Sequence, residues 1–190
     1  MRIIIGISGA SGVLVGYRLL QELQAHEDIE THLILSKDAI INFKLETDIT
    51  FEDVKASADF IYENDNMGAL ISSGSFKTDG MIVVPCSMKT LSGIAHGFDT
   101  NLLIRSADVC LKEGRKVVLV PREMPLSTAH IRNLLLAKEN GCCIMPAMLT
   151  FYNNADTLEK QVNHLVGKIL MQFDIQSSNF KAWDGGKHDE

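Results

Sequence analysis

Cysteine is scarce in this sequence, and its placement excludes several kinds of protein. Four of the 190 residues are cysteine, at Cys86, Cys110, Cys142 and Cys143. They lack the paired spacing of a zinc site and two of them are adjacent, so neither a structural metal nor a disulfide framework is expected. No basic partner is identifiable for Cys86, which favours a buried structural thiol over a nucleophile. We therefore expect a reduced, cytoplasmic protein.

The chain also lacks long apolar runs and an excess of positive charge. No apolar stretch approaches the roughly 18 residues that a membrane-spanning helix needs. The short run after Arg2 stops at a glycine and has no cleavage-site pattern, so no secretion signal is expected. Acidic residues outnumber basic ones by 24 to 18, a formal net charge of −6, which makes nucleic acid an unfavourable partner. A small anion can still bind, because its binding depends on cations near the site and not on the net charge of the chain.

What is present is a series of short apolar segments, rich in isoleucine and valine, that do not alternate with polar residues. Such segments are typical of strands buried on both faces of a parallel sheet. They begin at Arg2, Thr31, Met81, Lys116 and Cys142.

Amphipathic patterns separate these segments and predict helices over residues 12–26, 101–114, 127–141 and 155–173, with a further helix from about Met88. Gly114 and Gly141 are expected to end two of them, and Asp156 is expected to cap the last. Alternating strands and helices predict an α/β fold with a parallel sheet flanked by helices. We expect one domain over residues 1–175 and a polar tail over 176–190, docked in part through Trp183, the only tryptophan.

The first predicted strand runs into "GISGASG", residues 6–12. Small residues between a strand and a helix allow a ligand to approach the backbone, and a helix N-terminus attracts anions. The spacing is not the dinucleotide fingerprint, and the second strand ends in Ser36-Lys37 instead of a carboxylate. This favours a mononucleotide phosphate over NAD, with a ligand-free tight turn as the alternative.

Polar residues also follow later strands, where an α/β sheet binds its ligands. Ser87 and Thr90 in "PCSMKT" suit either phosphate binding or helix capping. Arg122 and Glu123 would be costly to bury unless they face a ligand or form an ion pair. Tyr152 in "FYNN" is either a hydrogen-bond donor to an anion or part of the core.

These motifs together resemble one family along essentially the whole chain. "GISGASG", "LSK", "ETD", "SSGSF", "PCSMKTLSGIAHG", "ADVCLKEGRKVVLVPREMPLS" and "FYNN", in this order, are similar to the UbiX-type flavin prenyltransferases. The segment "ISSGSFKTDGMIVVPCSMKTL" resembles the B subunits of bacterial hydroxyarylic (phenolic) acid decarboxylase systems.

The resemblance implies a fold, an activity and partners. It implies a Rossmann-like (flavodoxin-like) three-layer fold that assembles into a homo-oligomer, a dodecamer, with sites between subunits. The implied activity is transfer of a dimethylallyl group from dimethylallyl phosphate to N5 and C6 of reduced FMN. The product, prenyl-FMN, is the cofactor of a partner UbiD-type aromatic acid decarboxylase. No DDxxD-type carboxylate pair is present, so a metal-held diphosphate is not expected, although the residues leave monophosphate and diphosphate donors open.

The resemblance also implies site residues. FMN would be held by Gly9, Ala10, Ser11, Ser36, Ser87, Met88, Lys89, Thr90 and Arg122. The prenyl phosphate would lie among Arg105, Lys112, Glu123, Tyr152 and Lys168, with Glu46 close by. The implied catalytic residues are Ser11, Glu46, Glu123 and Tyr152. The family usually has arginine where this chain has Lys168, which keeps the charge and loses the bidentate fork.

Two alternatives have different functions. Flavin-dependent cysteine decarboxylases of the same superfamily carry a "PAMN" clamp, whereas this chain has "PAML", ending at Leu149. The other alternative is a non-catalytic, FMN-binding accessory subunit of a decarboxylase, against which the retained cations argue.

Overall fold

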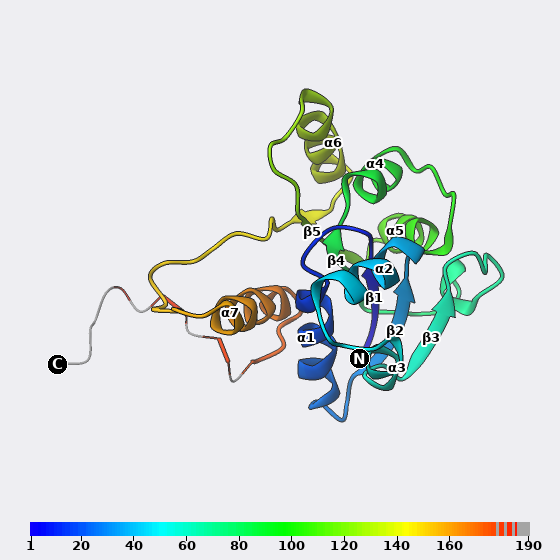
Figure 1. Cartoon of the computed structure of the whole chain (residues 1–190). Coiled ribbons are helices and arrows are strands. Elements are labelled where there is room, and N and C mark those ends of the chain that lie inside the picture. Colours follow the sequence, from blue (N-terminus) through cyan, green and yellow to red (C-terminus); the bar gives the residue numbers. More distant parts are fainter. Residues whose placement is uncertain (178, 181, 184, 186–190) are drawn as a thin grey trace.

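The computed structural model describes residues 1–177, 179–180, 182–183 and 185 (Figure 1). In these residues six strands form one sheet in the order β3-β2-β1-β4-β5-β6, and every pairing is parallel. The strands are β1 (Arg2–Ile7), β2 (Glu30–Leu35), β3 (Phe60–Glu63), β4 (Gly80–Cys86), β5 (Lys116–Pro121) and β6 (Cys143–Ile144). The predicted α/β fold with a parallel sheet is confirmed. Its strand order is that of the Rossmann fold rather than of flavodoxin, with the switch point between β1 and β4.

The two edges of the sheet differ from the sequence prediction. β3 was not predicted, because an edge strand needs no continuous apolar run, and its Phe60 and Ile61 remain 48% and 39% exposed. At the other edge, the segment from Cys142 forms only the two-residue strand β6. The central strands follow the prediction, and all seven residues of β4 are buried.

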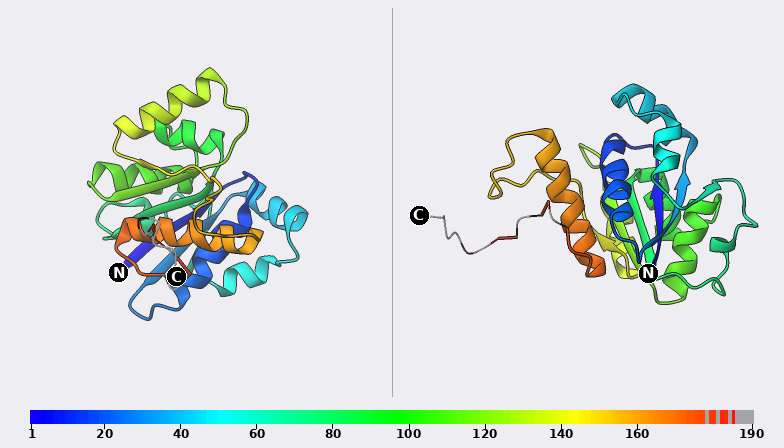
Figure 2. Two further views of the ribbon diagram at one scale, coloured as in Figure 1. Left: turned by 90° about the vertical axis from the view of Figure 1, so that its left-hand side faces the viewer. Right: turned by 90° about the horizontal axis from the view of Figure 1, so that it is seen from below.

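Two helical layers enclose the sheet (Figure 2). One layer contains α1 (Val13–Gln24), α2 (Lys37–Glu46), α3 (Phe51–Ala56) and α7 (Leu158–Leu170). The other contains α4 (Met88–His96), α5 (Leu102–Lys112) and α6 (Thr128–Glu139). Short 3₁₀ turns lie at Leu70–Ser72 and Met171–Phe173. Side chains alternate along β1, so that Ile3 and Ile5 join the first core and Ile4 joins the second. None of the helices in the described residues has the length and apolar character needed to cross a bilayer.

The helix ends agree with the sequence signals in all but one case. Gly114 and Gly141 follow α5 and α6 with φ of 68° and 102°, the left-handed conformation that glycine adopts easily. The prediction of Asp156 as the cap of α7 is wrong, because Thr157 takes that position and accepts a hydrogen bond from the N–H of Lys160 at 3.2 Å. Asp156 instead pairs with the Lys160 ammonium one turn on, at 2.6 Å.

Candidate active site

The buried hydroxyl of Ser8 ties together the ends of β1 and β4. It donates a hydrogen bond to the carbonyl oxygen of Pro85 at 2.9 Å and accepts one from the N–H of Ser87 at 2.7 Å. The backbone N–H of Ser8 also donates to Pro85, at 3.1 Å. The glycine loop that follows β1 is therefore held against the loop that follows β4, at the switch point of the sheet.

A cleft of about 340 Å³ opens beside these two loops. Five of the residues predicted to hold FMN line it: Gly9, Ser36, Ser87, Lys89 and Thr90. Of the other predicted residues, Ala10 and Met88 are buried and Ser11 is partly exposed. The cleft thus joins segments from β1, β2 and β4 that lie far apart in the sequence.

Two helix N-termini favour an anion at one part of the cleft, whose lining also carries the charges of Lys37, Lys89, Asp38, Glu63 and Asp65. Ser36 caps α2, accepting from the N–H of Ala39 at 3.1 Å, and Ser87 caps α4, accepting from the N–H of Thr90 at 3.3 Å. Of the two roles predicted for Ser87, the structure shows helix capping. Because both caps line the cleft, the positive ends of two helix dipoles meet there.

A third helix, α5, also begins at the cleft, but its first N–H groups are already bonded. Asn64 accepts from Leu102 through its carbonyl oxygen at 2.8 Å and from Leu103 through its side chain at 3.0 Å. Asn101 caps the helix by accepting from Ile104 at 3.0 Å. We therefore assign the attraction for an anion to α2 and α4.

Gly9 lies where a side chain has no room. An added Cβ would be 2.2 Å from the Cβ of Asp38, which is far inside van der Waals contact. Asp38 also approaches Lys89 across the cleft, with 3.6 Å between the carboxylate and the ammonium. Both side chains are largely exposed, so this pair is weak and leaves Lys89 able to turn toward a bound anion.

Glu46, from the end of α2, reaches the glycine loop. Its carboxylate accepts a hydrogen bond from the N–H of Gly12 at 2.8 Å. Gly12 precedes α1 with a φ of 100° and has no side chain to cap the helix. Glu46 therefore serves as the negative group at the start of α1, one residue from Ser11.

A second group of predicted residues gathers around α7. The ring of Tyr152 lies edge-on to the ring of His164 at 5.7 Å and to that of Trp183 at 5.4 Å between centroids. The rings of His164 and Phe180 lie 4.9 Å apart and are tilted by 33°, and the ammonium of Lys168 lies 5.9 Å from the centre of the Phe180 ring. Burial, and then the charge of Lys168, lower the pKa of His164.

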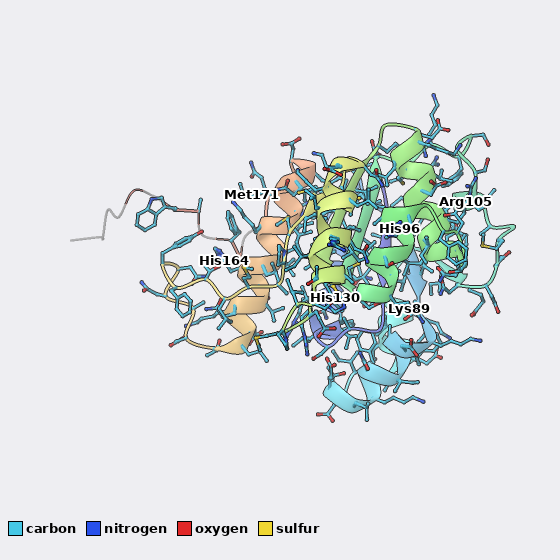
Figure 3. All side chains as sticks on the ribbon, turned by 90° about the horizontal axis from the view of Figure 1, so that it is seen from above. Lys89, His96, Arg105, His130, His164 and Met171 are labelled. Atoms are coloured by element: carbon cyan, nitrogen blue, oxygen red, sulfur yellow. The ribbon has the colours of Figure 1, made fainter. Side chains whose placement is uncertain are left out.

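Arg105 and Lys112 lie elsewhere. Arg105 is held by the carboxylates of Asp99 and Asp108, each at 3.0 Å, and Lys112 pairs with Glu113 at 3.2 Å. Figure 3 shows Arg105 at the opposite end of the molecule from His164, the neighbour of Tyr152. A single chain therefore does not bring Arg105 together with the α7 group.

Arg122 and Glu123 follow β5 and are exposed, so the single chain has no cost of burying them. Glu123 accepts a hydrogen bond from the N–H of Met124 in its own loop at 3.1 Å.

Cys86, by contrast, is fully buried, and burial raises the pKa of its thiol. This agrees with a structural thiol and not with a nucleophile.

Sequence reasoning missed several residues that shape these regions. His164 precedes Lys168 by one helical turn, a spacing that places both on one face of α7 and would have pointed to it. Asn101 lies directly before a segment with helical apolar periodicity, a position from which it could have been predicted as the N-cap of α5. Asn64 and Gln161 act through contacts with other segments, for which the sequence carries no local signal.

Comparison with known proteins gives full-length matches. Residues 1–173 match the family model described as Flavoprotein. A probable UbiX-like flavin prenyltransferase of Sedimentibacter hydroxybenzoicus is 62% identical over 189 residues, covering 100% of both chains. The crystal structure of a dodecameric FMN-dependent UbiX-like decarboxylase from Escherichia coli O157:H7 superposes with a TM-score of 0.96 at 49% identity, covering 97% of this chain and 100% of that one. AnUbiX in complex with FMN and dimethylallyl pyrophosphate gives a TM-score of 0.95 at 44% identity, covering 98% of both chains.

Proposed function

Because the chain belongs to the UbiX-like flavin prenyltransferase family, we propose that it transfers a dimethylallyl group from dimethylallyl phosphate to N5 and C6 of reduced FMN. The observation that carries the proposal is the cleft at the switch point, where five residues of the family's FMN motifs meet two helix N-termini. When bound, reduced FMN supplies the nucleophilic N5 and C6 atoms.

The residues of the cleft fit a flavin mononucleotide. The capped N-termini of α2 and α4, with Lys89, suit the phosphate, and the hydroxyls of Ser36 and Thr90 suit hydrogen bonds to a polar chain. Gly9 lets the loop after β1 lie close against Asp38 at the edge of the cleft, where a Cβ would collide with that side chain. We propose that Ala10, Ser11, Met88 and Arg122 complete the FMN site.

The donor phosphate requires cations, because negative charge builds on it as the carbon–oxygen bond breaks. We propose that Tyr152 and Lys168 bind it from one subunit and that Arg105, Lys112 and Glu123 come from a neighbouring one. The separation of Arg105 from the α7 group within one chain and the dodecameric state of the E. coli relative support this division. We propose the same dodecameric assembly here, with its sites between subunits.

Proton transfer also has candidate groups. Glu46 is bonded to Gly12, directly beside Ser11, so a carboxylate and a hydroxyl stand together at the glycine loop. We propose that Ser11, Glu46 and Glu123 hold and move protons during ring closure. We propose that the hydroxyl of Tyr152 donates a hydrogen bond to the departing phosphate. Enclosure between subunits would exclude water and hold both reactants in a productive orientation.

We propose that residues 1–175 form the flavoprotein domain and that residues 176–190 form a tail docked through Trp183, whose ring contacts Tyr152. Part of this tail, residues 178, 181, 184 and 186–190, lies outside the described residues.

The product is proposed to serve a UbiD-type decarboxylase, which provides a test. The protein is incubated anaerobically with reduced FMN and dimethylallyl phosphate or diphosphate, and the filtrate is added to an apo-decarboxylase of that type. We expect the filtrate to activate the decarboxylase. If authentic prenyl-FMN activates it and neither filtrate does, the transferase proposal is wrong and the accessory-subunit role is favoured.

A further inference from the structure

The segment that carries Tyr152 is held by one side chain. Gln161, near the start of α7, accepts a hydrogen bond from the N–H of Thr150 at 3.0 Å. Its amide nitrogen donates to the carbonyl oxygens of Thr150 at 2.7 Å and Ala155 at 2.9 Å. Residues 145–157 form no helix or strand, so these three bonds fix the backbone on both sides of Tyr152.

The same face of α7 also holds the Tyr152 ring. Residues 161, 164 and 168 follow at helical spacings of three and four, so they lie along one face. His164, which is 6% exposed, contacts the Tyr152 ring, and Lys168 lies one turn further along. The helix that carries the phosphate-binding cation therefore also sets the position of the phenol.

Only an amide satisfies this arrangement. Gln161 accepts with its oxygen and donates twice with its nitrogen, which matches one N–H and two carbonyl groups of the segment. A carboxylate of the same shape keeps one acceptor contact and places negative charge against both carbonyl oxygens. If Gln161 positions this segment, even the conservative change Gln161→Glu should disturb it.

We propose that Gln161 is a positioning residue, which fixes the hydroxyl of Tyr152 where it and Lys168 meet the phosphate of the prenyl donor. The inference rests on the proposed function, because the ligand is the donor of that reaction. Gln161 itself contacts neither the donor nor the flavin in this proposal, and it acts only by positioning Tyr152.

The test replaces Gln161→Glu and, as a variant without charge, Gln161→Met. Loss of two bonds to the segment in Gln161→Glu, and of all three in Gln161→Met, predicts a rise of at least about tenfold in the KM for dimethylallyl phosphate, with FMN affinity unchanged. The matched control is Gln24→Glu, since the exposed Gln24 donates one amide bond to the carbonyl oxygen of Ala56 at 3.2 Å, at the far end of α1. The control should keep the wild-type KM. An unchanged KM in both Gln161 variants overturns the inference.

Repeating Gln161→Glu in a Tyr152→Phe background distinguishes placement of the Tyr152 hydroxyl from a general structural role of Gln161. If Gln161 acts by placing the hydroxyl, the second change should add less than about twofold, whereas a full tenfold rise in this background overturns the proposal.

The Kd for dimethylallyl phosphate is measured in parallel with oxidised FMN bound, so that no turnover is needed. If the wild type binds the donor but forms no prenyl-FMN, the proposed function fails and the Kd of the variants still decides the role of Gln161. A tenfold weaker Kd in Gln161→Glu supports that role and an unchanged Kd refutes it.

Discussion

Removing the hydroxyl of Ser8 should damage both the stability of the protein and its flavin site. Ser8 is completely buried and its hydroxyl makes two hydrogen bonds between β1 and the loop after β4. In Ser8→Ala, the half-buried N–H of Ser87 loses its partner, while the carbonyl oxygen of Pro85 keeps its bond to the backbone of residue 8 at 3.1 Å. One orphaned donor and one lost bond cost about 2 kcal/mol together. For a chain of this size, that lowers the Tm by about 4–8 °C.

The chain offers a matched control in Ser106, which is equally buried. Its hydroxyl has no hydrogen-bond partner within the part of the chain that the structure describes. Ser106→Ala therefore removes a desolvated polar group that gains nothing from the fold, and its stability should stay unchanged or rise slightly. The two variants change the same atoms in equally buried places and differ in the bonds lost, apart from the small helix propensity that alanine adds within α5.

The assays are urea unfolding at one fixed protein concentration, because assembly stabilises the folded chain, and titration with FMN followed by flavin fluorescence. Ser8→Ala should lose stability and bind FMN about tenfold more weakly, since the two loops that line the cleft are no longer tied. Equal unfolding midpoints for Ser8→Ala and Ser106→Ala would refute this reasoning.

Three further predictions follow from other contacts. Gly9→Ala should weaken FMN binding at least tenfold, because its Cβ would lie 2.2 Å from that of Asp38, and Asp38→Gly should restore part of the affinity; an unchanged Kd would contradict the packing. Lys168→Met should raise the KM for the phosphate donor, and co-expression with an inactive Arg105→Ala variant should recover activity in mixed oligomers; no recovery would argue against shared sites. Burial lowers the pKa of His32, so the folded state resists its protonation and the free energy of unfolding should fall as the pH drops below about 6.5; a His32→Asn variant with an equally steep pH dependence would exclude this origin.

The sequence predicted most of the central sheet and five of the residues that line the cleft, for identifiable reasons. Buried parallel strands such as β4 are continuous apolar runs, and the residues after such strands must meet at one edge. The edge strand β3 could not be read in this way, because its exposed residues follow no apolar pattern. The role of Ser8 was equally hidden, since its two partners lie 77 and 79 residues away.

The α7 group shows a different limit. The motifs pointed to Tyr152 and Lys168 separately, but the contacts through His164 and the three bonds of Gln161 depend on how one irregular segment folds onto a helix. Propensity does not specify such a segment. The position of Arg105, far from this group, likewise follows from the packing of α5 and not from any local pattern.

The formation of prenyl-FMN by this chain can be measured directly. The most direct measurement loads the purified protein with FMN, reduces it without oxygen, adds dimethylallyl phosphate and identifies the released flavin by mass spectrometry. We expect FMN heavier by one isoprenyl unit from the wild type and much less of it from Lys168→Met. Recovery of unmodified FMN alone from the fully loaded, reduced wild-type protein, with both phosphate and diphosphate donors, would contradict the proposed function.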